Sequence, residues 1–291
     1  MKIGLMSYEI ESAKTIEELF KKVKEYGCEQ TQFSFHTFCP PEPPPDGPMS
    51  RMPRHLSDEM IEEVAYWSRV TDVEISMMTG FWNMISNDVN DRDQGLLHLE
   101  RLMQACVAAG CDVINLCTGS KGECMWCRCP ENDTVKAWLD ICHTMEQALK
   151  IADHYKIHLG VEIEASNVIN SAEKARKLMD EMQSPWLKIV LDGANVFLPG
   201  QCYYKNSTRI LKNAMDLVGK DIIGVHGKDM KEGEGHDFTY CGNGIVDFDY
   251  MLTELKRLNY DRGILLHGAH AEEEIAPSVA NMRRMMAEHN M

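Results

Sequence analysis

HLGVEIEASNVINSAEKARKLMDEMQSPWLKIVLDGAN, the sequence of residues 158–195, decides the fold. It reads as a short apolar strand that ends on Glu162 and Glu164, a helix, and a second apolar strand that ends on Asp192. Strand, helix and strand in this order form the repeating unit of a parallel sheet. In an α/β barrel the chemistry takes place at the carboxyl ends of the strands, which is where these acids lie. The stretch therefore predicts the fold class and the position of the site together.

The same alternation continues in both directions along the chain. Further strands are expected at 2–7, 30–35, 73–78, 113–117, 222–226 and 263–267, and further helices at 15–26, 57–70, 94–109, 134–154, 207–218, 248–258 and 272–289. With the central unit this gives eight strands and eight helices, which predicts a single (β/α)8 TIM barrel domain over residues 1–291. No GxGxxG motif follows a strand, so a dinucleotide-binding sheet is not indicated.

One proline-rich segment interrupts this alternation. Residues 39–53, CPPEPPPDGPMSRMP, contain seven of the 11 prolines in the chain. Proline is excluded from helix interiors and from central strands. The segment could be a linker between domains, but the alternation resumes directly after it. We therefore expect a stiff lid loop, about 37–55, over the barrel mouth.

Composition and charge exclude several classes of protein. A chain of 291 residues with 44% hydrophobic and 26% charged residues is typical of a globular enzyme the size of one barrel. The net charge of −15 argues against nucleic-acid binding, which needs clustered lysine and arginine. No signal-peptide pattern and no apolar run of about 20 residues is present, so a membrane is not expected. The 11 cysteines are interpreted as reduced thiols of a cytoplasmic protein.

Polar residues gather at the ends of four consecutive strands. They are Glu162 and Glu164 on the fifth strand, Asp192 and Asn195 on the sixth, His226 and Lys228 on the seventh, and His267 on the eighth. Side chains two residues apart share a face of a strand, so Glu162 and Glu164 should point the same way. Carboxylate and imidazole donors suit Mn²⁺, Mg²⁺, Co²⁺ or Zn²⁺. We therefore predict one divalent metal ion at the barrel mouth.

Each of these residues also fits an ordinary structural role when it is taken alone. Glu162 can begin a solvated loop, and Asp192 can form a turn with Gly193. His226 and His267 can be hydrogen-bonded core histidines. Several charged residues that end adjacent buried strands are harder to explain in this way, because buried charges must be paired or bound to metal. As a group they favour a site.

The expected loops at the barrel mouth carry further candidates. Cys124, Cys127 and Cys129 form a CxxCxC pattern, but no second cluster completes a tetrahedral site, so loop thiols are preferred over a metal site. Trp82 and Trp126 could stack on a sugar ring or could simply pack the lid.

Several stretches resemble the sugar phosphate isomerase/epimerase family of the xylose isomerase-like barrel superfamily. They are INLCTGSKGECMW at 114–126, GVEIEASNVINSAEKARKLMDEMQSPWLKIVLDGANVF at 160–197, HGKDM at 226–230, CGNGIVDFDYMLTEL at 241–255 and RGILLHGA at 262–269. The long central match and the H-x-K-D motif are specific for the superfamily. They are less specific for the reaction, because the superfamily also contains dehydratases and nucleases.

The resemblance implies one divalent metal, with Glu162, Asp192 and His226 as ligands. Ketose epimerases of the family have a glutamate on the last strand as the fourth ligand, and here His267 stands at that position. Asn195 stands where many relatives carry a histidine.

The family's epimerase scheme uses two glutamates on opposite faces of the substrate. One removes the proton beside the carbonyl and the other returns it, through an enediolate. Glu162 matches the first. His267 or Glu164 could act as the second, or a single base could shuttle the proton and give aldose–ketose isomerisation.

The expected function is a divalent-metal-dependent isomerase or epimerase of a sugar or sugar phosphate, with no nucleic-acid or membrane partner. Glu162, His267 and Lys228 are its expected catalytic residues, and the expected substrate contacts are Glu164, Asn195, Lys228, Trp82 and Trp126. The alternatives are a dehydratase or lyase that uses the same metal site, and a sugar-binding barrel without catalysis. The charge disfavours an endonuclease. The resemblance also suggests a homo-oligomer.

Overall fold

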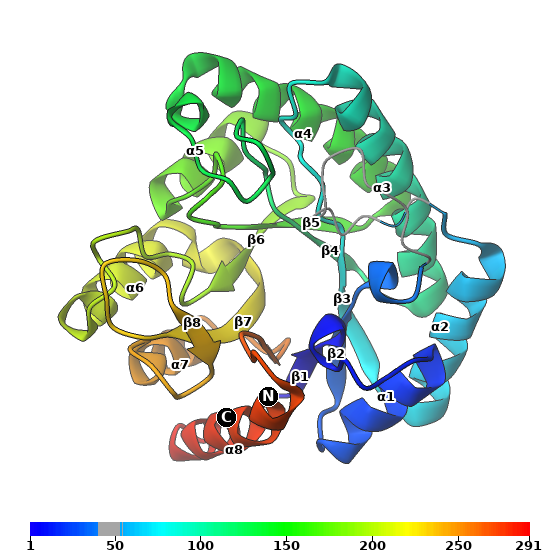
Figure 1. Cartoon of the computed structure of the whole chain (residues 1–291), viewed down its shortest axis with the longest axis vertical. Helices are drawn as coiled ribbons and strands as arrows, with labels where there is room; N and C mark the ends of the chain where they lie inside the picture. The colour runs from blue at the N-terminus through cyan, green and yellow to red at the C-terminus, as the bar shows by residue number, and fades with distance from the viewer. Residues whose placement is uncertain (40–52, 54) are drawn as a thin grey trace.

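Parallel strands close into a barrel, and helices surround it (Figure 1). The computed structural model describes residues 1–39, 53 and 55–291. Within these residues the barrel strands are β1 (Ile3–Met6), β2 (Gln30–Phe33), β3 (Glu74–Thr79), β4 (Val113–Leu116), β5 (His158–Glu162), β6 (Leu187–Asp192), β7 (Ile222–Met230) and β9 (Ile264–Leu266). Each strand pairs in parallel with the next, and pairings of β1 with β9 and of β6 with β7 close the ring. The expected (β/α)8 TIM barrel is confirmed.

The helices follow the strands in strict alternation. They are α1 (Ile16–Glu25), α2 (Asp58–Thr71), α3 (Val89–Ala109), α4 (Val135–Tyr155), α5 (Ala172–Met182), α6 (Tyr204–Val218), α7 (Phe248–Arg257) and α8 (Ile275–Glu288). Side chains cap several of them: Thr15, Ser57 and Asp247 each accept a hydrogen bond from a backbone N–H in the first turn. Within the described residues, every helix is too short or too polar to cross a bilayer.

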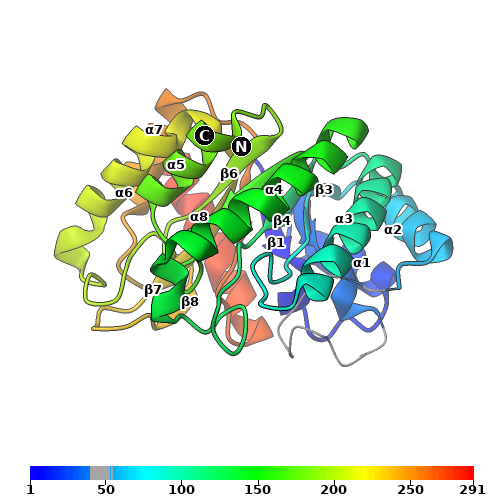
Figure 2. The ribbon, with the colours of Figure 1, turned by 90° about the horizontal axis from the view of Figure 1, so that it is seen from above.

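Two boundaries differ most from the sequence-based expectation. Helix α3 begins at Val89, five residues before the expected start, because the side chain of Asp88 caps it by accepting a hydrogen bond from Asn90 N. Strand β7 continues to Met230, because β8 (Phe238–Tyr240) pairs with its end in an antiparallel hairpin. Lys228 therefore lies on a strand and not in a loop. Figure 2 shows this hairpin at the end of the barrel opposite the two chain termini.

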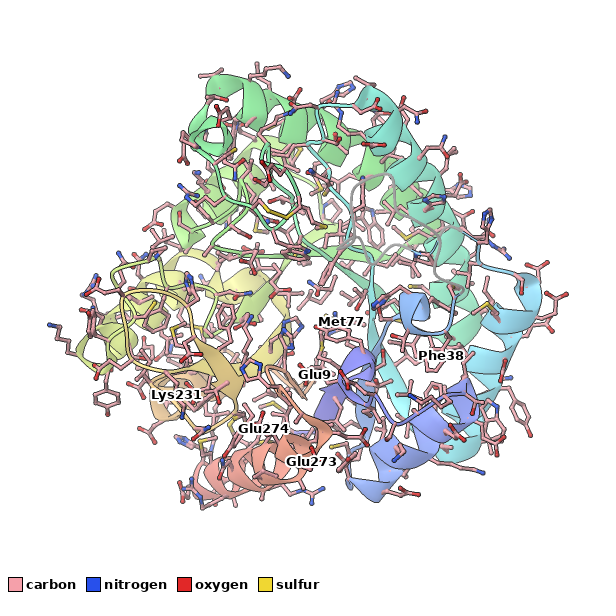
Figure 3. The ribbon with its side chains drawn as sticks, viewed as in Figure 1. Glu9, Phe38, Met77, Lys231, Glu273 and Glu274 are labelled. Atoms are coloured by element: carbon pink, nitrogen blue, oxygen red, sulfur yellow. A yellow bond between two sulfur atoms is a disulfide. The ribbon has the colours of Figure 1, made fainter. Side chains whose placement is uncertain are left out.

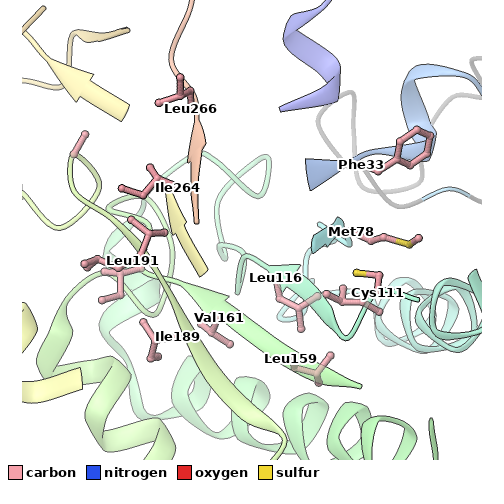
Figure 4. Close-up of a cluster of buried hydrophobic side chains, with 14 of the residues drawn as sticks. Phe33, Met78, Cys111, Leu116, Leu159, Val161, Ile189, Leu191, Ile264 and Leu266 are labelled. Carbon is pink, nitrogen blue, oxygen red and sulfur yellow. The ribbon is translucent and has the colours of Figure 1, made fainter. Parts of the chain in front are cut away.

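Successive side chains along each strand point alternately outward and inward, which gives the barrel two hydrophobic cores. Outward residues such as Leu159, Val161 and Leu191 pack between the strands and the helices (Figure 4). Inward residues fill the barrel as a small separate cluster: Met6, Met77, Val113, Val190, Ile223 and Leu265. Space inside is tight, since a Cβ atom on Gly224 would lie 2.5 Å from Met77 Sδ. The barrel is thus a packed core, and its open space lies at the mouth.

The expected lid falls mostly outside the described residues. Residues 40–52 and 54 of that segment are not described.

A charge cluster ties the loops on one side of the mouth to α4. Asp140 of α4 lies 2.6 Å from Lys121 Nζ, in the loop after β4, and 3.2 Å from Arg92 NH1 of α3. Lys121 Nζ also donates to the backbone carbonyl of Ile85 at 2.6 Å. Burial alone would raise the pKa of Asp140, but hydrogen bonds from Lys121 and Lys136 outweigh burial and lower the pKa to about 2. The carboxylate therefore holds three segments together.

We expect Asp140→Asn to lower the free energy of unfolding by about 1 to 2 kcal/mol at pH 7, after allowance for solvent screening. The folded pKa, about 2, lies below the usual 3.8, so this stability is fully present above pH 3.8 and is lost as the pH falls towards 2. Urea unfolding of the wild-type protein and the Asp140 variant at pH 7 and pH 3 measures this difference in the free energy of unfolding. Asp216→Asn, which breaks an exposed pair with Lys212, should have far less effect; equal losses in the two variants would contradict the account.

Candidate active site

Three metal-ligand side chains meet at the carboxyl ends of β5, β6 and β7. In the register of the barrel Asp192 pairs with His226, and Glu162 pairs with Val190, two residues before Asp192. His226 Nδ1 lies 3.5 Å from Glu162 Oε1 and 3.8 Å from Asp192 Oδ2. All three side chains are buried, and one ligand atom of each lies within 4.8 Å of the other two. Their donor atoms converge on one point.

Two of these buried donor atoms make no hydrogen bond among the described residues, although one of them, Asp192 Oδ2, has Lys228 Nζ at 3.1 Å as an ion-pair partner. They are Asp192 Oδ2 and His226 Nδ1. The other carboxylate oxygen, Asp192 Oδ1, accepts hydrogen bonds from the backbone N–H of Ala194 and Asn195 at 2.8 and 3.2 Å. Buried polar atoms without partners are costly and call for an explanation. A divalent cation between the oxygen and nitrogen donors would satisfy both, so the residues present fit such an ion.

Gln32, on β2, fixes the orientation of the imidazole. Its side-chain nitrogen donates to Thr79 Oγ1 at 3.0 Å and to Asn115 Oδ1 at 2.9 Å. Its oxygen therefore faces His226 Nε2, at 2.8 Å, and must accept a hydrogen bond from it. With Nε2 fixed as a donor, loss of the Nδ1 proton would leave the lone pair on Nδ1, the atom that faces the two carboxylates. Gln32 was not among the residues expected from the sequence, although it is a polar residue within a predicted strand.

The charges of the cluster support one another. Burial alone would lower the pKa of His226, but the carboxylates of Glu162 and Asp192 outweigh burial and raise the pKa to about 9. Burial would raise the pKa of Glu162, yet the nearby imidazolium of His226 lowers it. The pKa of Asp192 is likewise lowered, mainly by the ammonium of Lys228, against the effect of burial. Both carboxylates therefore stay ionised inside the barrel.

Asn195 and Lys228 connect the three side chains to the open pocket. Asn195 Nδ2 donates to Glu162 Oε1 at 2.7 Å, and its Oδ1 accepts from Lys228 Nζ at 2.7 Å. Lys228 Nζ also lies 3.1 Å from Asp192 Oδ2 and 4.0 Å from the ring centroid of Phe238. Burial would lower the pKa of Lys228, but the charge of Asp192 outweighs burial and raises it. The lysine is thus a fixed positive charge and not a base.

A pocket of about 490 Å³ opens above the cluster, which is within the usual range for small-molecule sites. Glu162, Glu164, Asn195, Lys228 and His267 all line it, together with Trp126. The structure therefore brings most of the residues expected from the sequence to one cavity, with Asp192 and His226 next to Glu162 at its base.

Trp82 does not line this pocket, contrary to the expectation. Its ring is buried against α3, where a Cβ atom on Gly95 would come within 2.1 Å of the indole nitrogen. The preceding residue, Phe81, lines the pocket instead and packs edge-on against Trp126, with ring centroids 5.8 Å apart. The path of the loop after β3 decides which aromatic ring faces the cavity, and sequence pattern does not reveal that path.

His267 follows β9, the strand that pairs with β7, and its ring lies 5.9 Å from that of His226, centroid to centroid. Glu9 holds it in the pocket lining. His267 Nδ1 lies 2.6 Å from Glu9 Oε1, and the same oxygen accepts a hydrogen bond from Gly268 N at 2.8 Å. Figure 3 shows Glu9 on the inner side of the ring of strands. Within the described residues the metal-type cluster contains only Glu162, Asp192 and His226, so His267 as a fourth ligand stays a prediction. The sequence analysis missed Glu9 because it follows β1 in a short 3-10 turn.

The loop that carries Trp126 is closed by a disulfide. Cys124 and Cys127 are bonded, whereas Cys129 is free. The interpretation of all cysteines as reduced thiols is wrong for this pair. The spacing alone fits free thiols, metal ligands or a disulfide, and only the loop geometry decides among them.

The fold and the site define a class: a (β/α)8 barrel with two carboxylates and an imidazole converging at the mouth. The model of the xylose isomerase-like TIM barrel family matches residues 20–287. The chain belongs to this family.

Curated relatives that match part of the chain are sugar-phosphate epimerases by name. L-ribulose-5-phosphate 3-epimerase UlaE of Escherichia coli O157:H7 is 26% identical over 199 residues, which are 68% of this chain and 64% of that protein. The Shigella flexneri serotype 5b protein of the same name is 25% identical over 177 residues, 61% of this chain and 57% of that protein. The chain thus matches less than two thirds of the length of either relative.

Solved structures share the fold over nearly the whole chain. The 3-keto-D-glucoside 4-epimerase YcjR from E. coli has a TM-score of 0.70 at 18% identity, with 99% of each chain covered. A D-tagatose 3-epimerase-like protein has a TM-score of 0.76 at 17% identity, covering 100% of this chain and 98% of that one. The IOLI protein with a bound zinc atom has a TM-score of 0.71 at 14% identity, covering 99% and 97%. At these identities the likeness shows the fold alone.

Proposed function

We propose that the protein is a divalent-metal-dependent sugar isomerase or epimerase that acts through an enediolate. The observation that carries this proposal is the convergence of Glu162, Asp192 and His226 beside the pocket, where two buried donor atoms make no hydrogen bond within the described residues. The names of the relatives and of two solved structures, which are epimerases or epimerase-like proteins, support the same reaction class. Action in the cytoplasm and assembly into a homo-oligomer stay predictions.

Glu162, Asp192 and His226 would hold the ion, for which Mn²⁺, Mg²⁺, Co²⁺ and Zn²⁺ are the candidates. A divalent ion bound there would polarise a substrate carbonyl and stabilise the negative charge that forms on its oxygen when the neighbouring C–H bond is broken. Lys228 supplies a second, fixed positive charge at the pocket wall, where Asn195 and Asp192 hold it.

Two groups in the pocket lining would move the proton. Glu162 lines the pocket on the β5 side and would take the proton from the carbon beside the carbonyl. His267 lines the pocket on the β9 side, and Glu9 can accept a hydrogen bond from its Nδ1. His267 would then return a proton from its other nitrogen to the opposite face, which inverts the carbon. Glu9 would thus orient His267 for this proton transfer.

The test is solvent-deuterium exchange into a panel of ketoses, their phosphate esters and inososes, followed by NMR in D₂O with metal-loaded protein. We expect deuterium at the carbon beside the carbonyl of at least one compound, together with its epimer or isomer. A dehydrated product would indicate the lyase alternative. No exchange into any compound, together with ligand-induced shifts of the melting temperature, would contradict the proposal in favour of a binding protein.

A further inference from the structure

The charged side chains around the pocket are mostly carboxylates. Glu9, Glu11, Glu162, Glu164 and Glu272 line it. Among the lining residues that the structure describes, Lys228 is the one lysine or arginine. Under the proposed function Glu162 would be bound to the metal, and a phosphate ester that entered this pocket would bring its two negative charges close to the other four carboxyl groups.

The one lysine is not free to bind a phosphate. Lys228 Nζ contacts Asn195 Oδ1 at 2.7 Å and Asp192 Oδ2 at 3.1 Å, and its side chain is 5% exposed. Moving it to a phosphate would leave the buried carboxylate of Asp192 without this positive charge. Separating a buried ion pair in this way is strongly unfavourable.

Backbone amides are the second means by which a barrel binds phosphate, usually in the loops after the last two barrel strands. After β7 these amides already bind a carboxylate of the chain itself. Asp229 accepts hydrogen bonds from the backbone N–H of Met230 at 2.8 Å, of Gly244 at 2.8 Å and of Val246 at 2.9 Å. These three amides are therefore not available to a ligand.

The loop after β9 is occupied in the same way. Gly268 N donates to Glu9 Oε1 at 2.8 Å, and His270 N donates to Glu274 Oε2 at 2.8 Å. The 3-10 turn before α8 consists of Glu272–Glu274. The start of a helix attracts anions such as phosphate, but here that position carries three carboxylates of the chain itself. Figure 3 labels Glu273 and Glu274 at the start of α8. The chain's own acids thus occupy backbone amides in both of the loops where a barrel usually binds phosphate.

The pocket does offer groups that recognise an uncharged sugar. Carboxylates accept hydrogen bonds from hydroxyl groups. Phe81, Trp126 and Phe238 supply aromatic surface in the lining, and such rings contribute apolar contact for the less polar face of a sugar. We propose, on the basis of the proposed function, that the substrate is an unphosphorylated keto-sugar, free or as a glycoside. This differs from the phosphorylated substrate in the name of the UlaE relatives.

The test compares matched pairs: L-ribulose with L-ribulose 5-phosphate, and D-fructose with D-fructose 6-phosphate. Binding to Zn²⁺-loaded protein is measured by calorimetry and saturation-transfer NMR, and exchange is measured in the same samples. We expect each sugar that binds to do so about tenfold or more tightly than its phosphate ester. Esters that bind as tightly or more tightly, or a complete lack of binding by unphosphorylated sugars, would overturn the inference. Binding is measured without turnover. A lack of deuterium exchange therefore counts against the proposed function alone. The relative affinities of each sugar and its phosphate ester decide this inference.

A charge variant tests the cause of the preference. Glu11 is exposed at the rim of the pocket. Glu11→Lys should reduce the ratio of sugar to ester affinity by about threefold or more, because it removes a negative charge and adds a positive one. Glu63→Lys makes the same change on the exposed face of α2 and should leave the ratio unchanged. Equal ratios in the two variants would contradict the role of the lining carboxylates.

Discussion

Replacing Asp192 with asparagine should abolish stoichiometric metal binding and slow solvent-deuterium exchange into the substrate by about 1,000-fold or more. Asp192 Oδ2 is buried, lacks a hydrogen-bond partner in the described chain and faces His226 Nδ1. Asparagine keeps the shape and can still accept the hydrogen bonds that Ala194 N and Asn195 N donate to Oδ1. It removes the negative charge that would hold a cation.

Metal content after dialysis, calorimetric titration with Mn²⁺ and Zn²⁺, and the exchange rate together measure this effect. Asp221→Asn is the matched control, because Asp221 lies before β7 at the other end of the strand and pairs with Arg176 and Lys188. It should leave the metal content unchanged. Normal metal content in the Asp192 variant, with circular dichroism that shows a folded protein, would contradict the assignment of this residue.

The second large effect is expected at His267. His267→Asn should lower the rate of epimer formation by about 100-fold or more, while exchange at the substrate carbon continues through Glu162. Glu9→Gln should cause a smaller loss of the same kind, about tenfold, because it replaces the carboxylate that would orient the imidazole. The two variants therefore change the ratio of exchange to inversion, which a general loss of folding would not do.

Metal analysis of the His267 variant also tests the prediction that this residue is a fourth ligand. Unchanged metal affinity would assign His267 to proton transfer alone, and weaker affinity would support ligation. If exchange and inversion fall by the same factor in both variants, His267 is not the second proton-transfer group.

The sequence was sufficient for the elements in which pattern and position agree. Glu162 and Asp192 could be selected because each ends a short apolar strand, and the ends of parallel strands meet at one edge of a barrel. His226 followed from the same rule. The caps Ser57 and Asp247 are local signals as well, because a helix start depends on a few neighbouring residues.

What could not be predicted depends on contacts between distant segments. Glu9 meets His267 across 258 positions of sequence, and Gln32 meets His226 across 194. No periodicity links such pairs. The choice of Phe81 over Trp82 as a pocket residue depends on how one loop turns against Gly95. Lys228 lines the pocket, but the strand that carries it extends this far because β7 pairs with β8.

Anomalous diffraction from crystals of the protein loaded with Mn²⁺, Co²⁺ or Zn²⁺ tests the central claim most directly. The account predicts one strong peak among Glu162, Asp192 and His226, at about 2.0 to 2.2 Å from an oxygen of each carboxylate and from His226 Nδ1. Fully loaded crystals with no peak among these three residues, or with the ion bound only elsewhere, would contradict it.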